Sequence, residues 1–167
     1  MDTLRIATYN IHKCVGMDRK YSPERIVDVL REIDADIVAL QEVVCHTNLR
    51  RRDHQAEYIA SELGMGFCLG ENRKHKGADY GNAILSRFPI YLHRNFDISV
   101  SSYEPRGCLW AKIADEDGKF VHFLNVHMQF DEADSRFRLA RRPMRCRPRP
   151  GRRAAIRRQL SPLLYQT

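Results

Sequence analysis

Polar side chains follow three apolar runs that are typical of buried β-strands. The first run leads into residues 8–12 (TYNIH), the second into residues 40–43 (LQEV) and the third into residues 124–127 (LNVH). In layered α/β folds, side chains at strand ends converge from distant sequence positions to form ligand sites. An amide, a carboxylate and an imidazole brought together in this way can hold one hard cation and one phosphoryl group.

Glu42 is the carboxylate of this set, and Mg²⁺ is one hard cation that such a set could hold. Mg²⁺ takes one or two carboxylates, keeps several waters and binds substrate phosphate oxygens. Each motif alone is weak evidence, because a lone Gln-Glu is usually a solvated strand end and a lone Asn-x-His is usually a turn. The three motifs in this order are much more specific.

The first forty residues predict a strand, a helix and a second strand. Residues 4–9 (LRIATY) and 36–40 (DIVAL) are apolar runs suited to buried strands. Between them, Ser22 can cap a helix whose first position is Pro23. Apolar residues at helical spacing give that helix one inner face. This order, with a parallel crossover, predicts α/β layering.

The rest of the body is predicted to contain one more helix and several strands. The helix is expected from the potential cap Asp53 to Gly64, a natural left-handed stop. A turn at 115–118 joins the last two strand candidates in a hairpin. The strand candidates are residues 67–69, 82–86, 108–113 and 119–126.

Charge is divided unevenly along the chain. All 21 acidic residues lie at or before Asp134. From Ser135 onward the charged residues are eleven arginines, so the net charge of +7 comes from this tail and the body is mildly acidic. Overall charge therefore gives no argument that the body binds nucleic acid.

We predict a domain over residues 1–130 and an irregular Arg/Pro-rich tail over residues 131–167. Three prolines within residues 136–158 would interrupt any helix there. One interpretation is a functional basic arm. The other is that the tail was never selected to fold with the body, for example because the reading frame shifted, since ordinary protein surfaces mix charges of both signs.

The five cysteines are scattered without zinc-ligand spacing, so we expect reduced and mostly buried thiols. Residues 1–5 have neither the basic start nor the apolar stretch of a secretion signal. No apolar run approaches the roughly 18 residues that a membrane helix needs. A cytoplasmic location, with no membrane span and no evident obligate protein partner, is the default expectation.

The ordered motifs resemble the endonuclease/exonuclease/phosphatase superfamily of metal-dependent phosphoesterases. They are TYNIH, DIVALQEV, YGNAILSR, PRG and LNVH, and the resemblance spans residues 4–130. It implies a four-layer α/β/β/α sandwich with mixed β-sheets, of which the later strands are missing here. It also implies phosphoester hydrolysis with Mg²⁺, or Mn²⁺ as an alternative.

The resemblance assigns roles to three residues, and two further residues are candidates from their positions. Glu42 matches the principal metal ligand, and Asn10 matches a polar group that supports the metal and the phosphate. His127 matches the active-site histidine that hydrogen-bonds the scissile phosphate and stabilises its developing charge. Asn82 and Arg106 are candidate substrate contacts, since a guanidinium suits phosphate geometry. The alternatives are a core histidine, a turn asparagine and a solvated arginine.

Two motifs that the resemblance leads us to expect are absent. The family mechanism is direct attack of water on phosphorus, assisted by metal. It uses a Gly-Asp-x-Asn run to position the water and a Ser-Asp-His run for a base-like histidine. No aspartate follows Asp134 and no histidine follows His127.

The leading hypothesis is a truncated or frame-shifted member of this superfamily. Its intact form would hydrolyse a phosphoester in nucleic acid, a phospholipid or a small phosphodiester. The alternative is a non-catalytic remnant whose arginine-rich tail binds nucleic acid or anionic membrane with steep salt dependence. A third option, an enzyme completed by a partner chain, has no support in the sequence.

We expect this chain to show little or no phosphoesterase activity. Loss of groups that act as one catalytic unit is strongly non-additive and typically costs several orders of magnitude in rate. A steady-state assay with a phosphodiester and Mg²⁺ checks this expectation. Steady turnover that disappears in a Glu42→Ala variant would contradict it.

Overall fold

A computed structural model describes residues 3–46, 53–100, 103–115, 117–128 and 147–148. Most of the tail predicted from residue 131 lies outside these ranges, so both of its interpretations stay predictions. The elements in chain order are β1 (Ile6–Asn10), the 3₁₀ helix η1 (His12–Cys14), α1 (Pro23–Ile33), β2 (Ile37–Cys45), α2 (Gln55–Glu62), β3 (Gly66–His75), β4 (Ala78–Ser86), β5 (Ile90–Asp97), β6 (Gly107–Ala114), β7 (Phe120–Val126) and β8 (Arg147–Pro148).

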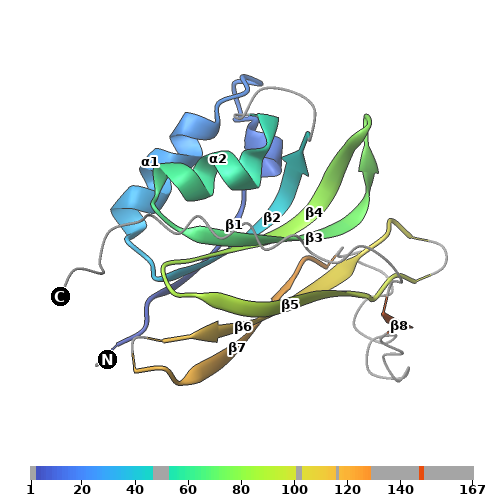
Figure 1. Cartoon of the computed structure of the whole chain (residues 1–167). Helices are drawn as coiled ribbons and strands as arrows, with labels where there is room; N and C mark the ends of the chain where they lie inside the picture. The colour runs from blue at the N-terminus through green and yellow to red at the C-terminus, as the bar shows by residue number, and fades with distance from the viewer. Residues whose placement is uncertain (1–2, 47–52, 101–102, 116, 129–146, 149–167) are drawn as a thin grey trace.

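The described residues form three layers (Figure 1). One sheet has the strand order β1-β2-β4-β3, and the other has the order β7-β6-β5-β8. Helices α1 and α2 cover the outer face of the first sheet, and the second sheet packs on its inner face (Figure 1). Strands β1 and β2 are parallel, as the predicted crossover requires, and the remaining pairs are antiparallel. The predicted α/β sandwich is confirmed, and within the described ranges it comprises one helical layer and two sheets.

Both predicted helices form, but neither is capped as predicted. Pro23 occupies the first turn of α1, yet the Ser22 side chain makes no capping hydrogen bond. Its hydroxyl donates to the Glu24 carboxylate instead. At α2 the capping acceptor is Nδ1 of His54, at 3.2 Å from the backbone N of Glu57, and not Asp53. Short polar side chains compete for nearby backbone groups, so tertiary contacts decide which one caps.

Strands β2, β3, β4 and β6 are longer than the apolar runs that predicted them. Strand β3 extends to His75 through polar residues, and β5 was not predicted at all. The prediction that the first strand is buried was wrong, because β1 lies at a sheet edge and Ile6 is 53% exposed. The hairpin around residues 115–118 is confirmed, with β6 and β7 paired in antiparallel register.

Three buried carboxamides tie the two sheets together. Asn125 of β7 donates to the carbonyls of Leu40 and Ala83 in the first sheet, at 2.8 Å each. Its own Oδ1 accepts from Nε2 of Gln41 at 2.8 Å. Asn82 of β4 donates in the other direction, to the carbonyl of Gly107 at 3.1 Å. Because an unpaired buried amide is costly, this network fixes the register between the layers.

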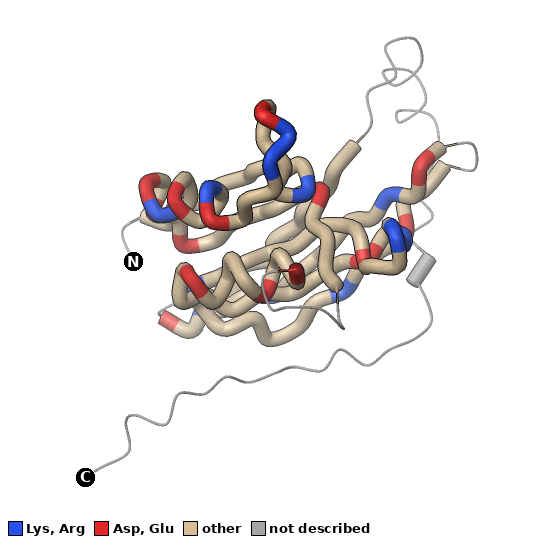
Figure 2. Tube along the Cα trace, turned by 90° about the horizontal axis from the view of Figure 1, so that it is seen from above, with Lys and Arg blue, Asp and Glu red and all other residues tan. Residues whose placement is uncertain are grey.

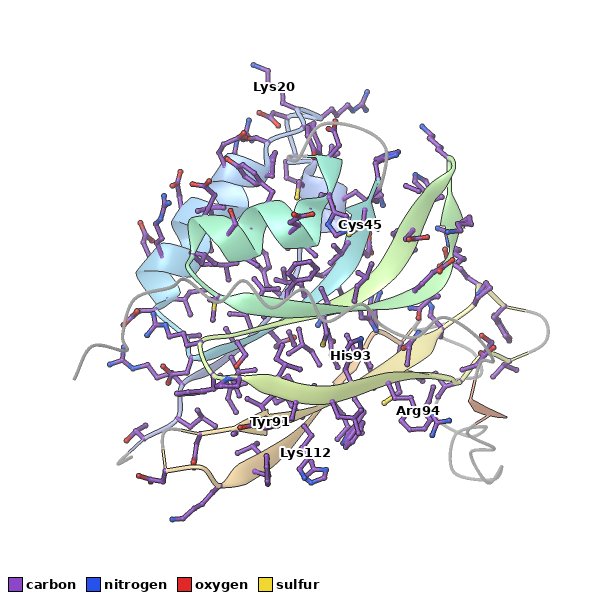
Figure 3. The ribbon with its side chains drawn as sticks, viewed as in Figure 1. Lys20, Cys45, Tyr91, His93, Arg94 and Lys112 are labelled. Carbon is purple, nitrogen blue, oxygen red and sulfur yellow. The ribbon has the colours of Figure 1, made fainter. Side chains whose placement is uncertain are left out.

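The outer face of the second sheet exposes large apolar side chains. Tyr91 and Phe120 pack edge to face, and Lys112 lies 3.7 Å from the centre of the Phe120 ring. Tyr91 and Lys112 lie along this sheet in Figure 3. The exposed members include Tyr91, Leu92, Phe120, Leu124 and Val126. An apolar surface of this kind favours self-association.

The described residues carry charges of both signs, and three of their cysteines are buried thiols, as expected. Acidic and basic residues intermingle over the described parts of the chain (Figure 2). The thiols of Cys14, Cys45 and Cys68 are free and buried, and burial raises their pKa values to about 12. Cys146 lies outside the described residues. Among those residues, no helix combines the length and the apolar character needed to cross a bilayer.

Gly81 of β4 is expected to tolerate no side chain. A Cβ there would lie 1.9 Å from the carbonyl oxygen of Gly70 in β3. We expect Gly81→Ala to lower the free energy of unfolding by about 2–3 kcal/mol, as overpacking does. Urea denaturation followed by circular dichroism measures it. Gly66→Ala is the matched control, because its Cβ would come no closer than 3.7 Å, and an equal loss in both variants would contradict the steric account.

Candidate active site

Glu42 lies in a β-bulge. Strand β2 pairs Leu40 with Ala83 and then Val43 with Gly81, so two residues of β2 face one residue of β4. Glu42 takes a left-handed backbone conformation with φ of 56°. Bulges re-aim side chains and are frequent beside active sites, and a left-handed backbone in a non-glycine residue costs about 1–3 kcal/mol. The bulge sends neighbouring side chains to different places, with Gln41 in the buried network and Glu42 at the surface of the site.

The end of β1 supplies the first partner of this carboxylate. Nδ2 of Asn10 donates to Oε1 of Glu42 at 3.0 Å. The amide oxygen of Asn10 accepts from the backbone N of His12 at 3.0 Å. The Asn10 side chain is therefore fixed at both ends and orients Glu42.

Two basic side chains of η1 approach the other carboxylate oxygen. Nζ of Lys13 lies 3.0 Å from Oε2 of Glu42, and Nδ1 of His12 lies 3.4 Å from it. Burial raises the pKa of Glu42, but the hydrogen bonds from Asn10 and Lys13 outweigh it and leave the pKa below its ordinary value. Glu42 is therefore an anion at neutral pH, as a metal ligand must be.

A second bulge, in β3, positions Arg73 on the other side of β4. Glu71 pairs with Gly81 and Arg73 with Tyr80, which leaves Asn72 as the extra residue. The guanidinium carbon of Arg73 lies 4.3 Å from the centre of the Tyr80 ring. Burial raises the pKa of Tyr80 to about 12, so its phenol stays protonated.

Arg106 reaches His127 from the loop before β6. Nη1 of Arg106 lies 3.3 Å from Nδ1 of His127. A guanidinium only donates, so Nδ1 accepts and the His127 proton resides on Nε2. Burial and the Arg106 charge together lower the pKa of His127. The imidazole is therefore neutral at neutral pH, with one N–H left to donate.

The backbone of Arg106 is fixed on both sides. Its N–H donates to Oγ of Ser99 at 3.0 Å, and its carbonyl accepts from the backbone N of Ile98. Gly107 follows, and a Cβ there would lie 2.0 Å from Oδ1 of Asn72. Only glycine allows this close approach between β6 and the β3 bulge.

Glu104 joins the two arginines of the site. Its Oε1 lies 2.5 Å from Nη2 of Arg73, and its Oε2 lies 2.8 Å from Nη2 of Arg106. Analysis of the sequence missed both Glu104 and Arg73. The Glu-Pro-Arg-Gly run at 104–107 was the available signal, since it sets a carboxylate two residues before the candidate arginine.

The structure brings together most of the predicted site residues. Asn10 contacts Glu42, and Arg106 contacts His127. Asn82 differs, because it is 1% exposed and its amide nitrogen donates to the backbone between the sheets. Its place in the buried network accounts for the polar residue in this strand without a substrate contact.

The donor set suits a loosely held Mg²⁺. Within the described ranges, no cluster of three or more His, Cys, Asp or Glu residues could hold a metal ion. Glu42 is a single ionised carboxylate with an amide beside it. That is sufficient for an ion that keeps several waters and takes substrate oxygens. Lys13 marks the same oxygen as a seat for positive charge.

The model of the endonuclease/exonuclease/phosphatase family matches residues 7–165. This chain belongs to that family. Members of the family are phosphoesterases and nucleases that generally use divalent metals.

Curated relatives of this family member include the uncharacterised protein YbhP of Escherichia coli K12. The two are 33% identical over 147 residues, which cover 83% of this chain and 58% of YbhP. The YbhP sequence of Shigella flexneri gives the same values. The chain thus spans 58% of the length of these relatives.

Solved structures confirm the fold. A family protein from Beutenbergia cavernae is 23% identical with a TM-score of 0.64, covering 78% of this chain and 39% of that one. One from Leptotrichia buccalis is 19% identical with a TM-score of 0.62, covering 79% and 56%. The D. rerio protein TDP2, solved with a single-strand DNA product, is 15% identical with a TM-score of 0.56, covering 78% and 48%.

Replacing Arg106 is expected to raise the pKa of His127. In Arg106→Gln the nearby positive charge is gone, so the pKa of His127 should rise towards its ordinary value. NMR titration of the imidazole nitrogens measures the change. Arg94→Gln is the control, because that guanidinium lies over Phe96 of β5. A pKa that stays constant or falls in Arg106→Gln would refute the assigned contact.

Proposed function

We propose that this chain forms a metal-dependent phosphoester hydrolase site in which Glu42 holds Mg²⁺. Membership of the family supports hydrolysis of phosphoesters. The observation that carries the proposal for this site is the bulge at Glu42, which delivers an ionised carboxylate next to the Asn10 amide. Bound Mg²⁺ would supply charge stabilisation for the phosphoryl oxygens.

Asn10 and Lys13 prepare the carboxylate for this role. Asn10 holds Oε1 and sets the orientation of the group. Lys13 balances the charge on Oε2 in the free chain. A cation that binds here competes with Lys13, whose ammonium is then free to approach a substrate anion.

Arg106 and His127 form the phosphate-binding side of the proposed site. The guanidinium provides a permanent positive charge and a planar set of donors that suits phosphate oxygens. By donating to Nδ1, it also keeps the His127 proton on Nε2. That N–H can then donate to a phosphate oxygen as negative charge develops, which is preorganised electrostatic stabilisation.

Binding of the cation is the sharpest test, because the predicted turnover of this chain is low. We expect Mn²⁺, followed by electron paramagnetic resonance as a probe for Mg²⁺, to bind the full chain, and Glu42→Gln to weaken binding by at least about tenfold. Glu57→Gln is the matched control, since Glu57 lies in the first turn of α2. Equal Mn²⁺ affinity in Glu42→Gln and the unaltered chain would rule out the proposed metal site.

A further inference from the structure

Two guanidinium groups from different parts of the sequence converge on one carboxylate. Arg73 comes from the β3 bulge and Arg106 from the loop before β6. Nη2 of Arg73 lies 2.5 Å from one oxygen of Glu104, and Nη2 of Arg106 lies 2.8 Å from the other. Since like charges repel, the Glu104 anion stabilises the approach of both guanidiniums to one point.

Arg73 keeps one buried N–H donor that Glu104 does not engage. A guanidinium can donate through two parallel N–H groups to one oxyanion. Nε of Arg73 is buried and has no hydrogen-bond partner. The side chains of Arg73 and Arg106 are 28% and 13% exposed, so the pair is largely withdrawn from water.

The three members differ in how firmly they are held. Arg73 stacks on Tyr80. It follows a bulge whose flanking residues, Glu71 and Arg73, both pair with β4. Arg106 is fixed through Ser99 at its backbone. Glu104 lies outside the strands, between β5 and β6, so its carboxylate can move away without breaking a strand hydrogen bond.

We propose that Arg73 and Arg106 form a seat for a phosphate group, which Glu104 fills in the free chain and leaves when phosphate binds. A phosphate carries more charge than a carboxylate and has enough oxygens to pair with both guanidiniums at once. The inference rests on the proposed function, because it takes the phosphoester's own phosphate as the ligand. It adds Arg73 as a second phosphate contact and Glu104 as an internal competitor.

Neutralising Glu104 should therefore strengthen phosphate binding. We expect Glu104→Gln to bind inorganic phosphate about five- to tenfold more tightly than the unaltered full chain, measured by isothermal titration calorimetry. Glu104→Ala should also tighten binding, and circular dichroism checks that each variant is folded. Unchanged or weaker binding in both folded variants would show that Glu104 only holds the arginines in place, and would overturn the proposal.

A control is needed for the general effect of removing a negative charge. Asp79→Asn changes the charge equally, at a carboxylate that pairs with Lys74 on the β3–β4 hairpin, and should leave phosphate affinity within about twofold. The gain from Glu104→Gln should vanish when Arg73→Gln is added, because the seat then lacks one arm. A gain that persists in Arg73→Gln, or an equal gain in Asp79→Asn, would overturn the proposal.

The metal site and the phosphate seat can be tested separately. The phosphate titrations are run with EDTA, so they do not depend on Glu42 binding a cation. Tight Mn²⁺ binding with no effect of Glu104→Gln on phosphate affinity would refute the phosphate seat but not the proposed function. Absence of Mn²⁺ binding at Glu42, with tighter phosphate binding in Glu104→Gln, would refute the proposed metal site and support the phosphate seat.

Discussion

The bulge in β2 is the constraint on which the rest of the site depends. In a regular strand, Gln41 and Glu42 would simply alternate between the faces of the sheet. Here the extra residue and the left-handed backbone of Glu42 let Gln41 join the buried carboxamides while Glu42 meets Asn10 and Lys13. The contacts of both side chains offset the conformational cost. One local distortion thus serves the core and the site together.

The buried carboxamides fix the position of the second sheet relative to β2. Asn125 binds the backbone of two strands of the first sheet, and His127 follows it by two residues. A shift of β7 by one residue would remove those hydrogen bonds and move the imidazole away from Arg106. Neutral amides suit this position, because burying a charge between the sheets would cost far more than burying an amide. The position of His127 is therefore set by core hydrogen bonding.

The site has more basic than acidic side chains, whereas the body has more acidic than basic ones. Residues up to Asp134 are mildly acidic overall, yet the site gathers Lys13, Arg73 and Arg106 around two carboxylates. Glu42 is paired with Lys13, and Glu104 is paired with Arg73 and Arg106. In the proposed site, Lys13 occupies the position of the metal cation and Glu104 that of the phosphate. Prepaired charges of this kind keep a polar site ordered before its ligands arrive.

The sequence by itself determined the layers and the main strand ends. Apolar runs, Pro23 and the hairpin turn specify local elements. Asn10, Glu42 and His127 stand out because polar residues of these types rarely serve packing at the end of a buried strand. It could not determine the exposure of β1, the cap at His54 or the burial of Asn82, since these depend on which neighbours a residue meets. Arg73 and Glu104 likewise become part of the site only through the β3 bulge and the loop before β6. Bulges and loop contacts join residues far apart in the chain, so only the tertiary structure decides them.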